Sequence, residues 1–214
     1  MTRATSRLPR TLLAVSLAAL SLAAGALAWR LLELRGAPAP QALIVLPEPR
    51  VIADFALEDQ TGKTFSIDGF RGRWSVLFFG FTSCPDVCPN TLYELQQVRS
   101  ILQERVGSDR LPAVYLISVD PERDTPEKLA GYLGHFDPSF TGLTGADAQL
   151  RALTTQLGIM YHIEPHDPGN REYAVEHSAS LLLLDPQARL HGVLPAPHDA
   201  DQIAGDLLTV LDRT

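Results

Sequence analysis

The 214-residue chain contains only two cysteines, Cys84 and Cys88, in the stretch Cys-Pro-Asp-Val-Cys. Two thiols at this spacing suit three kinds of chemistry: they bind a soft metal ion, cycle as a redox disulfide, or form a permanent disulfide in an oxidising compartment. A permanent disulfide that closes so short a loop adds little stability. Redox pairs of the thioredoxin type have two intervening residues instead of three. The cysteine pair alone leaves all three alternatives open.

The elements around the cysteines place them where a strand ends and a helix begins. Residues 74–81 are a continuous apolar run too short for a helix, which is typical of a strand buried on both faces. From Pro89 onward, apolar residues recur every three or four positions, which predicts an amphipathic helix. If Pro85 is the first helical residue, free backbone N–H groups and the positive end of the helix dipole face the sulfurs. We therefore expect lowered thiol pKa values.

A histidine could supply a third metal ligand, although all six histidines lie far from the cysteines along the chain. His135 lies near the end of a predicted helix, where a cation is favourable, and His191 and His198 are interpreted as ordinary surface residues. His177 differs, because it precedes the apolar run at 180–184 and is tethered to a predicted core strand. Two sulfurs and one imidazole would form a low-coordinate site that suits Cu(I), whereas zinc usually takes four ligands.

Met160, His162 and His166 form a second, looser group of potential metal ligands. Glu164 and the following Pro165 lie between the two histidines, and an Asp-Pro pair follows them. This composition is typical of a solvated loop, which we prefer to a metal-binding loop here.

The rest of the chain predicts an α/β domain. Thr61-Gly62 separates two β-prone runs, which indicates a hairpin across residues 51–67. Buried strands then alternate with helices, as in an α/β sheet with covered faces, and an antiparallel strand pair precedes the last helix. The later elements are expected as a strand at 111–119, helices at 126–136 and 146–157, strands at 180–184 and 189–194, and a helix at 199–211.

The amino-terminal part predicts a membrane anchor. Residues 1–10 contain three arginines and no acid, and the 18 residues from Leu12 to Trp29 are uncharged. At ~1.5 Å per residue this run spans ~27 Å of helix, close to the thickness of a bilayer core. A secretory signal cleaved after Ala26-Leu27-Ala28 is the alternative. The expected organisation is a basic cytoplasmic N-terminus at 1–10, a membrane anchor at 11–29, a Pro-rich tether at 30–50 and one folded domain at 51–214.

The distribution of charge predicts a location and excludes one class of partner. The arginines before the anchor outweigh Arg30 and Arg35 after it, so the positive-inside rule indicates a single-pass protein of the bacterial inner membrane with its domain in the periplasm. Residues 31–214 carry 14 basic and 25 acidic side chains, a formal charge of −11. This negative charge repels the phosphate backbones of nucleic acids, so we expect no nucleic-acid partner.

Three motifs together resemble the Sco/SenC family of thioredoxin-fold copper proteins. They are, in chain order, Thr82-Ser83-Cys84-Pro85-Asp86-Val87-Cys88-Pro89, then Ser118-Val119-Asp120-Pro121-Glu122-Arg123-Asp124-Thr125-Pro126-Glu127, and lastly Tyr173 with Glu176-His177-Ser178-Ala179. The resemblance covers the domain from about residue 51, and a membrane anchor with a tether is also usual in this family. It implies a thioredoxin-like α/β fold with a central mixed sheet.

The resemblance also implies a function. It implies copper binding through Cys84, Cys88 and His177, with the two cysteines able to form a redox disulfide, and it leaves the working state, Cu(I) or Cu(II), open. It implies a role in assembling the dinuclear copper centre of cytochrome c oxidase, either by delivering copper to the subunit with this centre or by reducing its cysteines. A copper donor protein is a further implied partner. We therefore expect a binding and transfer protein rather than a turnover enzyme.

Three acidic residues are candidates for supporting roles. Asp86 lies between the cysteines and Asp120 lies in the second motif, and each could shape a partner surface or a turn. Glu176 stands where the family usually has an aspartate immediately before the ligand histidine. Its carboxylate is a candidate for orienting that histidine.

Two enzymatic functions that use the same cysteines are alternatives to copper transfer. A thiol-disulfide oxidoreductase acting on extracytoplasmic cysteines would need Cys84 and Cys88 but would largely tolerate the loss of His177. A peroxide reductase would need a low-pKa attacking thiolate that its neighbour resolves. The oxidoreductase is the main alternative to copper transfer.

Overall fold

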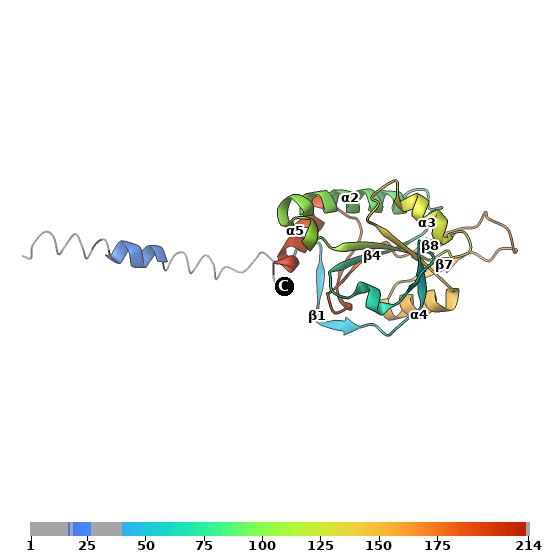
Figure 1. Ribbon diagram of the computed structural model, residues 1–214, viewed down its shortest axis with the longest axis horizontal. Coiled ribbons are helices and arrows are strands. Elements are labelled where there is room, and N and C mark those ends of the chain that lie inside the picture. Colours follow the sequence, from blue (N-terminus) through green and yellow to red (C-terminus); the bar gives the residue numbers. More distant parts are fainter. Residues whose placement is uncertain (1–16, 18, 27–39, 213–214) are drawn as a thin grey trace, which may run out of the picture. The chain divides into compact units, whose positions relative to one another are not determined.

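The computed structural model describes residues 17, 19–26 and 40–212, in two units that divide after residue 38 (Figure 1). In the first unit, residues 19–26 are helical. No helix in the described ranges is both long and apolar enough to span a bilayer. The basic segment at 1–10, most of the predicted anchor and residues 30–39 of the predicted tether lie outside the described residues. The anchor therefore stays a prediction.

The second unit is a mixed α/β domain built on one large sheet. Its strands are β1 (Ile44–Val51), β2 (Leu57–Asp59), β3 (Thr64–Phe65), β4 (Ser75–Gly80), β5 (Ala113–Ser118), β6 (Thr141–Thr144), β7 (Tyr161–Ile163), β8 (Val175–His177), β9 (Leu181–Leu184) and β10 (Arg189–Leu194). Its α-helices are α2 (Val87–Val106), α3 (Pro126–Leu133), α4 (Asp147–Leu157) and α5 (Ala200–Leu211), and short 3-10 helices cover Ile67–Phe70 and Ser108–Arg110.

The main sheet is eight-stranded and has the order β1-β10-β9-β4-β5-β6-β2-β3. Strands β4, β5 and β6 are parallel to one another, and the other neighbours are antiparallel. Strands β7 and β8 form a separate two-stranded hairpin. The sequence-based prediction of an α/β fold with a central mixed sheet is confirmed.

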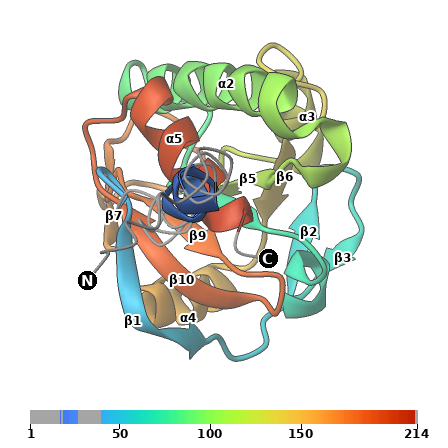
Figure 2. The ribbon, with the colours of Figure 1, turned by 90° about the vertical axis from the view of Figure 1, so that its left-hand side faces the viewer.

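Alternating side chains of β4 build two hydrophobic cores, one on each face of the sheet. Val76 and Phe78 belong to the core formed with α2, α3 and α5, whereas Leu77 and Phe79 belong to the core formed with α4. Figure 2 shows this division, with α2, α3 and α5 on one side of the sheet and α4 on the other. Because side chains alternate between the faces of a strand, a strand covered on both faces has an uninterrupted apolar sequence. The predicted strand at 74–81 is thus confirmed.

Two differences from the predicted elements matter for the site. Helix α2 begins at Val87, so Pro85 is not its first residue and Cys88 lies inside the helix. Residues 44–50, expected in the tether, form most of edge strand β1 instead. The register of β1 shifts between Val45 and Arg50, in the stretch that contains two prolines. Proline is tolerated at such an edge, where no further strand needs its missing N–H group.

Candidate metal centre

Cys84 and Cys88 lie at the junction of β4 and α2, as the sequence predicts. Cys84 is half-buried, and its N–H group donates a hydrogen bond to the Phe81 carbonyl at 3.3 Å. Cys88 is the second residue of α2 and is fully buried. The Cys88 N–H group lies in the first turn of the helix and has no acceptor within it. It donates a hydrogen bond to the Cys84 sulfur at 3.5 Å instead. Both cysteines are free thiols.

His177 is the last residue of β8 and reaches the cysteines from the β7–β8 hairpin. Its Nδ1 lies 3.0 Å from the Ser178 carbonyl oxygen, and its Nε2 lies 3.4 Å from the Cys88 sulfur. Because a carbonyl oxygen only accepts, we assign the ring proton to Nδ1 and a lone pair to Nε2. A metal-binding histidine needs this arrangement, with one nitrogen anchored and the other free.

The ligand atoms of Cys84, Cys88 and His177 lie within 4.8 Å of one another. In the described part of the chain, no second group of three or more His, Cys, Asp or Glu residues is close enough to hold a metal ion. Two sulfurs and an imidazole nitrogen are soft donors that favour Cu(I) over Mg²⁺ or Ca²⁺. The structure therefore brings together the three residues singled out in the sequence, in a site suited to a soft metal ion.

Burial shifts the pKa values of two of these three groups in opposite directions. It raises the pKa of the Cys88 thiol, although a backbone hydrogen bond from Phe81 lowers it in part. It lowers the pKa of His177, against the smaller effect of the hydrogen bond to Ser178. The expected lowering of thiol pKa is wrong for Cys88, because loss of solvent outweighs the helix N-terminus. A metal ion must therefore displace the Cys88 proton, whereas His177 is already the neutral ligand.

Gly80, at the end of β4, makes room for the Cys88 sulfur. A Cβ atom at this position would lie 2.8 Å from that sulfur and 3.0 Å from the Phe78 ring. The sequence analysis missed this role. Its only signal was a glycine inside an otherwise apolar strand, which indicates a close approach by another group.

Asp124 of the second motif holds the start of the cysteine loop. This buried carboxylate accepts hydrogen bonds from the Thr82 N–H group at 2.8 Å and the Ser118 hydroxyl at 2.7 Å. The Lys128 ammonium group lies 3.3 Å away. Because a buried charge is costly unless it is paired and hydrogen-bonded, these partners bind the loop firmly to the motif.

Arg123 joins the same motif to the loop that precedes the hairpin strand β8. Its guanidinium group forms an ion pair with the buried Asp120 carboxylate and donates to the Tyr173 carbonyl at 3.1 Å. It also lies over the Tyr173 ring, 3.8 Å from the centroid, and 5.4 Å from the Phe81 centroid. The Phe81 ring in turn makes an edge contact with His177 at 5.8 Å. The sequence analysis quoted Arg123 in a motif but assigned it no role.

The three acidic candidates have different environments. Asp120 is buried and accepts hydrogen bonds from Arg123 and, at 2.7 Å, from the Tyr173 hydroxyl. Asp86 is exposed and accepts a hydrogen bond from the Asn90 side chain at 2.7 Å. Glu176 is exposed, and within residues 40–212 its carboxylate has no hydrogen-bond or ion-pair partner. Of the three, only Asp120 is part of the network around the site.

The looser group at 160–166 does not assemble into a metal site. His166 binds the Glu164 carbonyl through Nδ1 at 2.8 Å and the Glu122 carboxylate through Nε2 at 2.9 Å. Met160 and His162 are exposed. His166 is therefore occupied by structural contacts rather than left in a solvated loop.

The remaining histidines lie away from the sulfurs. His135 is exposed and follows the C-terminal end of α3, near the helix end where the sequence places it. The expectation of ordinary surface positions is wrong for the other two: His191 packs edge-on against Trp74 at 4.9 Å, and the His198 Nε2 lies 2.8 Å from the Ala179 carbonyl oxygen.

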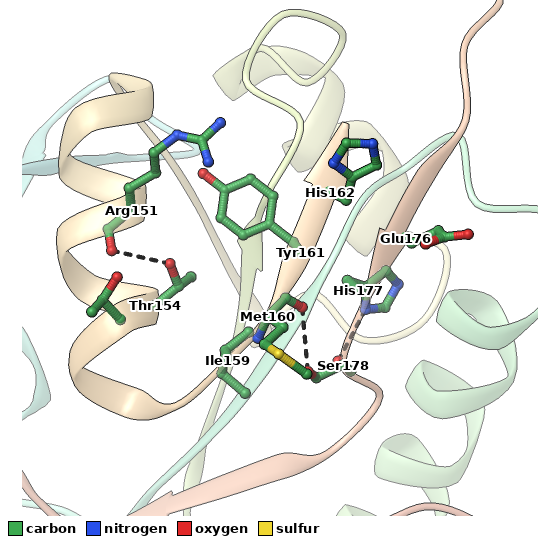
Figure 3. Close-up of a pocket in the computed structure, with 10 residues that line it drawn as sticks. Arg151, Thr154, Ile159, Met160, Tyr161, His162, Glu176, His177 and Ser178 are labelled. Carbon is green, nitrogen blue, oxygen red and sulfur yellow. Dashed lines mark hydrogen bonds between the residues drawn. The ribbon is translucent and has the colours of Figure 1, made fainter. Parts of the chain in front are cut away.

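A pocket of about 700 Å³ lies beside the site, between α4 and the β7–β8 hairpin (Figure 3). His177 and Ser178 line one part of it, and Tyr161 and Arg151 line another. The pocket leaves space next to the candidate histidine ligand for a group of another molecule.

Comparisons with known proteins show which family this sequence resembles. A sequence model of the SCO1/SenC family matches residues 46–212. A Stutzerimonas stutzeri protein, named as a candidate copper-binding protein, is 39% identical over 171 residues, which cover 80% of this chain and 82% of the relative. The Rickettsia felis SCO2-like protein is 39% identical over 136 residues, which cover 64% of this chain and 65% of the relative.

Solved structures show the same fold. Arabidopsis thaliana ScoI with copper bound is 30% identical and superposes with a TM-score of 0.68, covering 76% of this chain and 98% of the other. Yeast Sco1 with copper bound is 28% identical and superposes with a TM-score of 0.72, covering 78% of this chain and 91% of the yeast chain. The expected thioredoxin-like fold is confirmed by these similarities.

Proposed function

The chain belongs to the SCO1/SenC family, and from this membership we propose that it binds copper as cargo through Cys84, Cys88 and His177. The observation that carries the proposal is the convergence of these three ligand atoms within 4.8 Å. Their chemistry fits the ion, because thiolate and imidazole donors are soft and three of them suit low-coordinate Cu(I). The copper-bound structures of two similar proteins support copper as the ion.

The proposal extends to the destination of the copper. The protein delivers copper to, or matures, the dinuclear copper centre of cytochrome c oxidase, and a copper donor protein loads it. The family resemblance supports this role. The recipient is the oxidase subunit that contains the centre, since its ligand groups must meet Cys84, Cys88 and His177 directly.

Ligand exchange transfers the ion without releasing it to solvent. Cys84 is half-buried whereas Cys88 is fully buried, so an incoming thiolate meets the copper from the Cys84 side. The recipient sulfur forms a bond to Cu(I), the bond to Cys84 breaks, and the Cys84 thiolate keeps its electron pair and later takes up a proton. The oxidation state of copper does not change in this step. Repetition at the other two ligands completes the transfer.

The location is also part of the proposal. The basic segment at 1–10 and the uncharged run at 12–29 support a single-pass anchor in a bacterial inner membrane with the domain in the periplasm. We expect the full chain to stay in the membrane fraction after an alkaline carbonate wash and its domain to be digested by protease added to spheroplasts. Release by the wash contradicts the anchor, and full protection contradicts the periplasmic domain.

Copper binding by the full chain in detergent tests the central claim. We expect one Cu(I) per reduced chain, and affinities lowered roughly tenfold or more in Cys84→Ser, Cys88→Ser and His177→Ala. The matched control is His162→Ala, because His162 is an exposed histidine of the same hairpin. Competition with a chromophoric Cu(I) chelator measures each affinity. A weak Cu(I) affinity of the wild type that is unchanged in His177→Ala would contradict the copper function.

A thiol-disulfide oxidoreductase is the second candidate function. It is favoured by two free thiols whose sulfurs lie within 4.8 Å, with Cys84 accessible to a substrate. Reduction of a disulfide-linked oxidase peptide measures this activity. Activity that survives in His177→Ala but is lost in Cys84→Ser supports the oxidoreductase, whereas no reduction by the wild type excludes it.

A further inference from the structure

His166 joins the loop between β7 and β8, residues 164–174, to the turn at residues 120–124. Its Nδ1 lies 2.8 Å from the Glu164 carbonyl oxygen, and its Nε2 lies 2.9 Å from the Glu122 carboxylate. Both partners only accept hydrogen bonds, whereas a neutral imidazole has a single N–H group. The two hydrogen bonds therefore form together only when the His166 ring is protonated and positively charged. We call this arrangement the imidazolium bridge.

The ring of Tyr173 extends the imidazolium bridge toward the metal centre. The His166 ring stacks on it with 3.6 Å between centroids and 8° between planes, and the Arg123 guanidinium lies 3.8 Å from the same centroid. Since two planar groups cannot share one face at these distances, the Tyr173 ring lies between them. Arg123 in turn lies 5.4 Å from the centroid of Phe81, whose ring contacts His177. A continuous row of side-chain contacts thus leads from His166 to His177.

The turn at residues 120–124 supports both halves of the metal centre. On the cysteine side, the Asp124 carboxylate binds the Thr82 N–H group at the start of the cysteine loop. On the histidine side, the turn binds the loop at 164–174 through His166, and this loop leads into β8, which ends at His177. Loss of the imidazolium bridge would loosen the histidine side and leave the cysteine side in place. The bridge therefore bears on the position of His177 relative to the sulfurs.

Charged groups from three segments surround the His166–Glu122 pair. They are Asp120, Glu122 and Arg123 of the turn, Glu164 and Arg171 of the loop, and Asp147 and Arg151 of α4. Two ion pairs, one within the turn and one on α4, neutralise four of these groups. The Glu164 carboxylate accepts a hydrogen bond from the Ala174 N–H group, and Tyr173 stays neutral because burial raises its pKa. Glu122 is therefore the carboxylate that pairs with the ring.

The same contacts favour the proton on the ring. The hydrogen bond to the Glu164 carbonyl raises the pKa of His166 most, and the one to the Glu122 carboxylate raises it next. The imidazolium bridge is therefore complete at about pH 6 and is lost as the pH rises through the raised pKa, when the proton passes to water.

We propose that His166 is a positioning residue of the metal centre, whose imidazolium bridge to Glu122 holds the β7–β8 hairpin so that His177 retains copper. This inference rests on the proposed copper binding. With the bridge closed, His177 stays against the cysteine sulfurs and copper leaves slowly. With the bridge open, the hairpin moves more freely, His177 dissociates more often, and an incoming ligand takes the ion faster.

Hydrogen exchange in the reduced, copper-free full chain in detergent tests the bridge without the metal. At about pH 6 we expect the amides of residues 161–177 to exchange about three- to tenfold faster in His166→Gln than in the wild type, as for loss of one net hydrogen bond. The matched control is His162→Gln, an exposed histidine of the same hairpin, which should exchange like the wild type. Equal exchange in His166→Gln and His162→Gln overturns the inference, whether or not the protein binds copper.

The rate at which Cu(I) passes to an excess of a chromophoric chelator tests the link to the metal centre. We expect His166→Gln to lose copper about three- to tenfold faster than the wild type at about pH 6, and at the same rate at about pH 9. Thiol protonation changes the rates of both proteins alike, so the ratio of the two rates isolates His166. A ratio of one at both pH values, or a ratio that does not change with pH, overturns the positioning role.

Glu122→Gln gives a second, opposite test. Its amide can accept from a protonated ring and donate to a neutral one, so the contact no longer needs the proton. We expect this variant to lose copper at least about twofold more slowly than the wild type at about pH 9. Loss at or above the wild-type rate there contradicts the imidazolium bridge. If the wild type binds no copper at all, the proposed function fails, and the hydrogen-exchange result still decides whether the bridge exists.

Discussion

The Nε2 atom of His177 lies 3.4 Å from the Cys88 sulfur, although the two residues are 89 positions apart in the chain. Cys88 is fixed by the first turn of α2, whereas His177 ends a hairpin outside the main sheet. The Phe81 ring lies against His177 and within reach of Arg123. The site therefore depends on packing between independent segments, and changes to that packing should affect copper binding without abolishing the fold.

Gly80→Ala should weaken copper binding through steric displacement of one ligand. The new Cβ atom would lie 2.8 Å from the Cys88 sulfur, so this sulfur or the Phe78 ring must move. We expect a roughly tenfold loss of Cu(I) affinity in a protein that still folds. Gly131→Ala is the control, because a Cβ atom there meets nothing within 4 Å. Equal affinities of the two variants in a chelator competition would show that the close approach has no functional consequence.

The two cysteines should differ in reactivity in the reduced, copper-free protein. Cys84 is half-buried, whereas Cys88 is fully buried and its pKa is raised by burial. Cys88→Ser, which keeps Cys84, should therefore react with iodoacetamide at least about tenfold faster than Cys84→Ser. Mass spectrometry gives both rates, and the same measurement in guanidinium should abolish the difference. A faster Cys84→Ser variant would contradict the assigned burial.

Removal of the Arg123 side chain should destabilise the protein strongly. Arg123→Met leaves the Asp120 carboxylate buried without its cationic partner, which costs about 3–5 kcal/mol of unfolding free energy. It also removes the stack on Tyr173 and so loosens the loop before the hairpin. Urea denaturation measures the change.

The exposed ion pair between Arg71 and Asp68 provides the control for this substitution. Arg71→Met should cost about 0–1 kcal/mol, as is typical of surface pairs. If Arg123→Met costs no more than Arg71→Met, the buried network does not hold the site together.

His166 should titrate above its ordinary pKa of 6.5. The hydrogen bond to the Glu164 carbonyl raises this pKa most, followed by the bond to the Glu122 carboxylate. Because the pKa of His166 is higher in the folded than in the unfolded protein, protonated His166 stabilises the fold. This stabilisation is complete below about pH 6.5 and is lost as the pH rises through the pKa of His166 in the folded protein. NMR titration of the histidine ring signals measures it.

Glu122→Gln should move the His166 pKa back towards 6.5. His177 provides an internal contrast, because burial lowers its pKa and its signals should titrate below that value. For His177 the sign is reversed: its contribution to stability is present above about pH 6.5 and is lost as the pH falls through its lowered folded-state pKa. Overlapping titration curves for the two rings would contradict both assignments.

The chemistry of the site could be predicted from the sequence because its signals are local. The spacing of Cys84 and Cys88, the apolar run before them and the helical periodicity after them each span only a few residues. His177 stood out because it adjoins an apolar strand, and the three motifs together indicated the family. These patterns also predicted the central strand β4 and the covered sheet, since side-chain periodicity follows directly from backbone geometry.

The tertiary structure alone decided how these residues work together. It placed His177 against Cys88 and put Gly80 next to the Cys88 sulfur. It also reversed the expected shift of the Cys88 pKa. No local pattern reports these features, because burial and long-range contact depend on segments that fold together from distant parts of the chain, and desolvation then outweighs the local field of the helix.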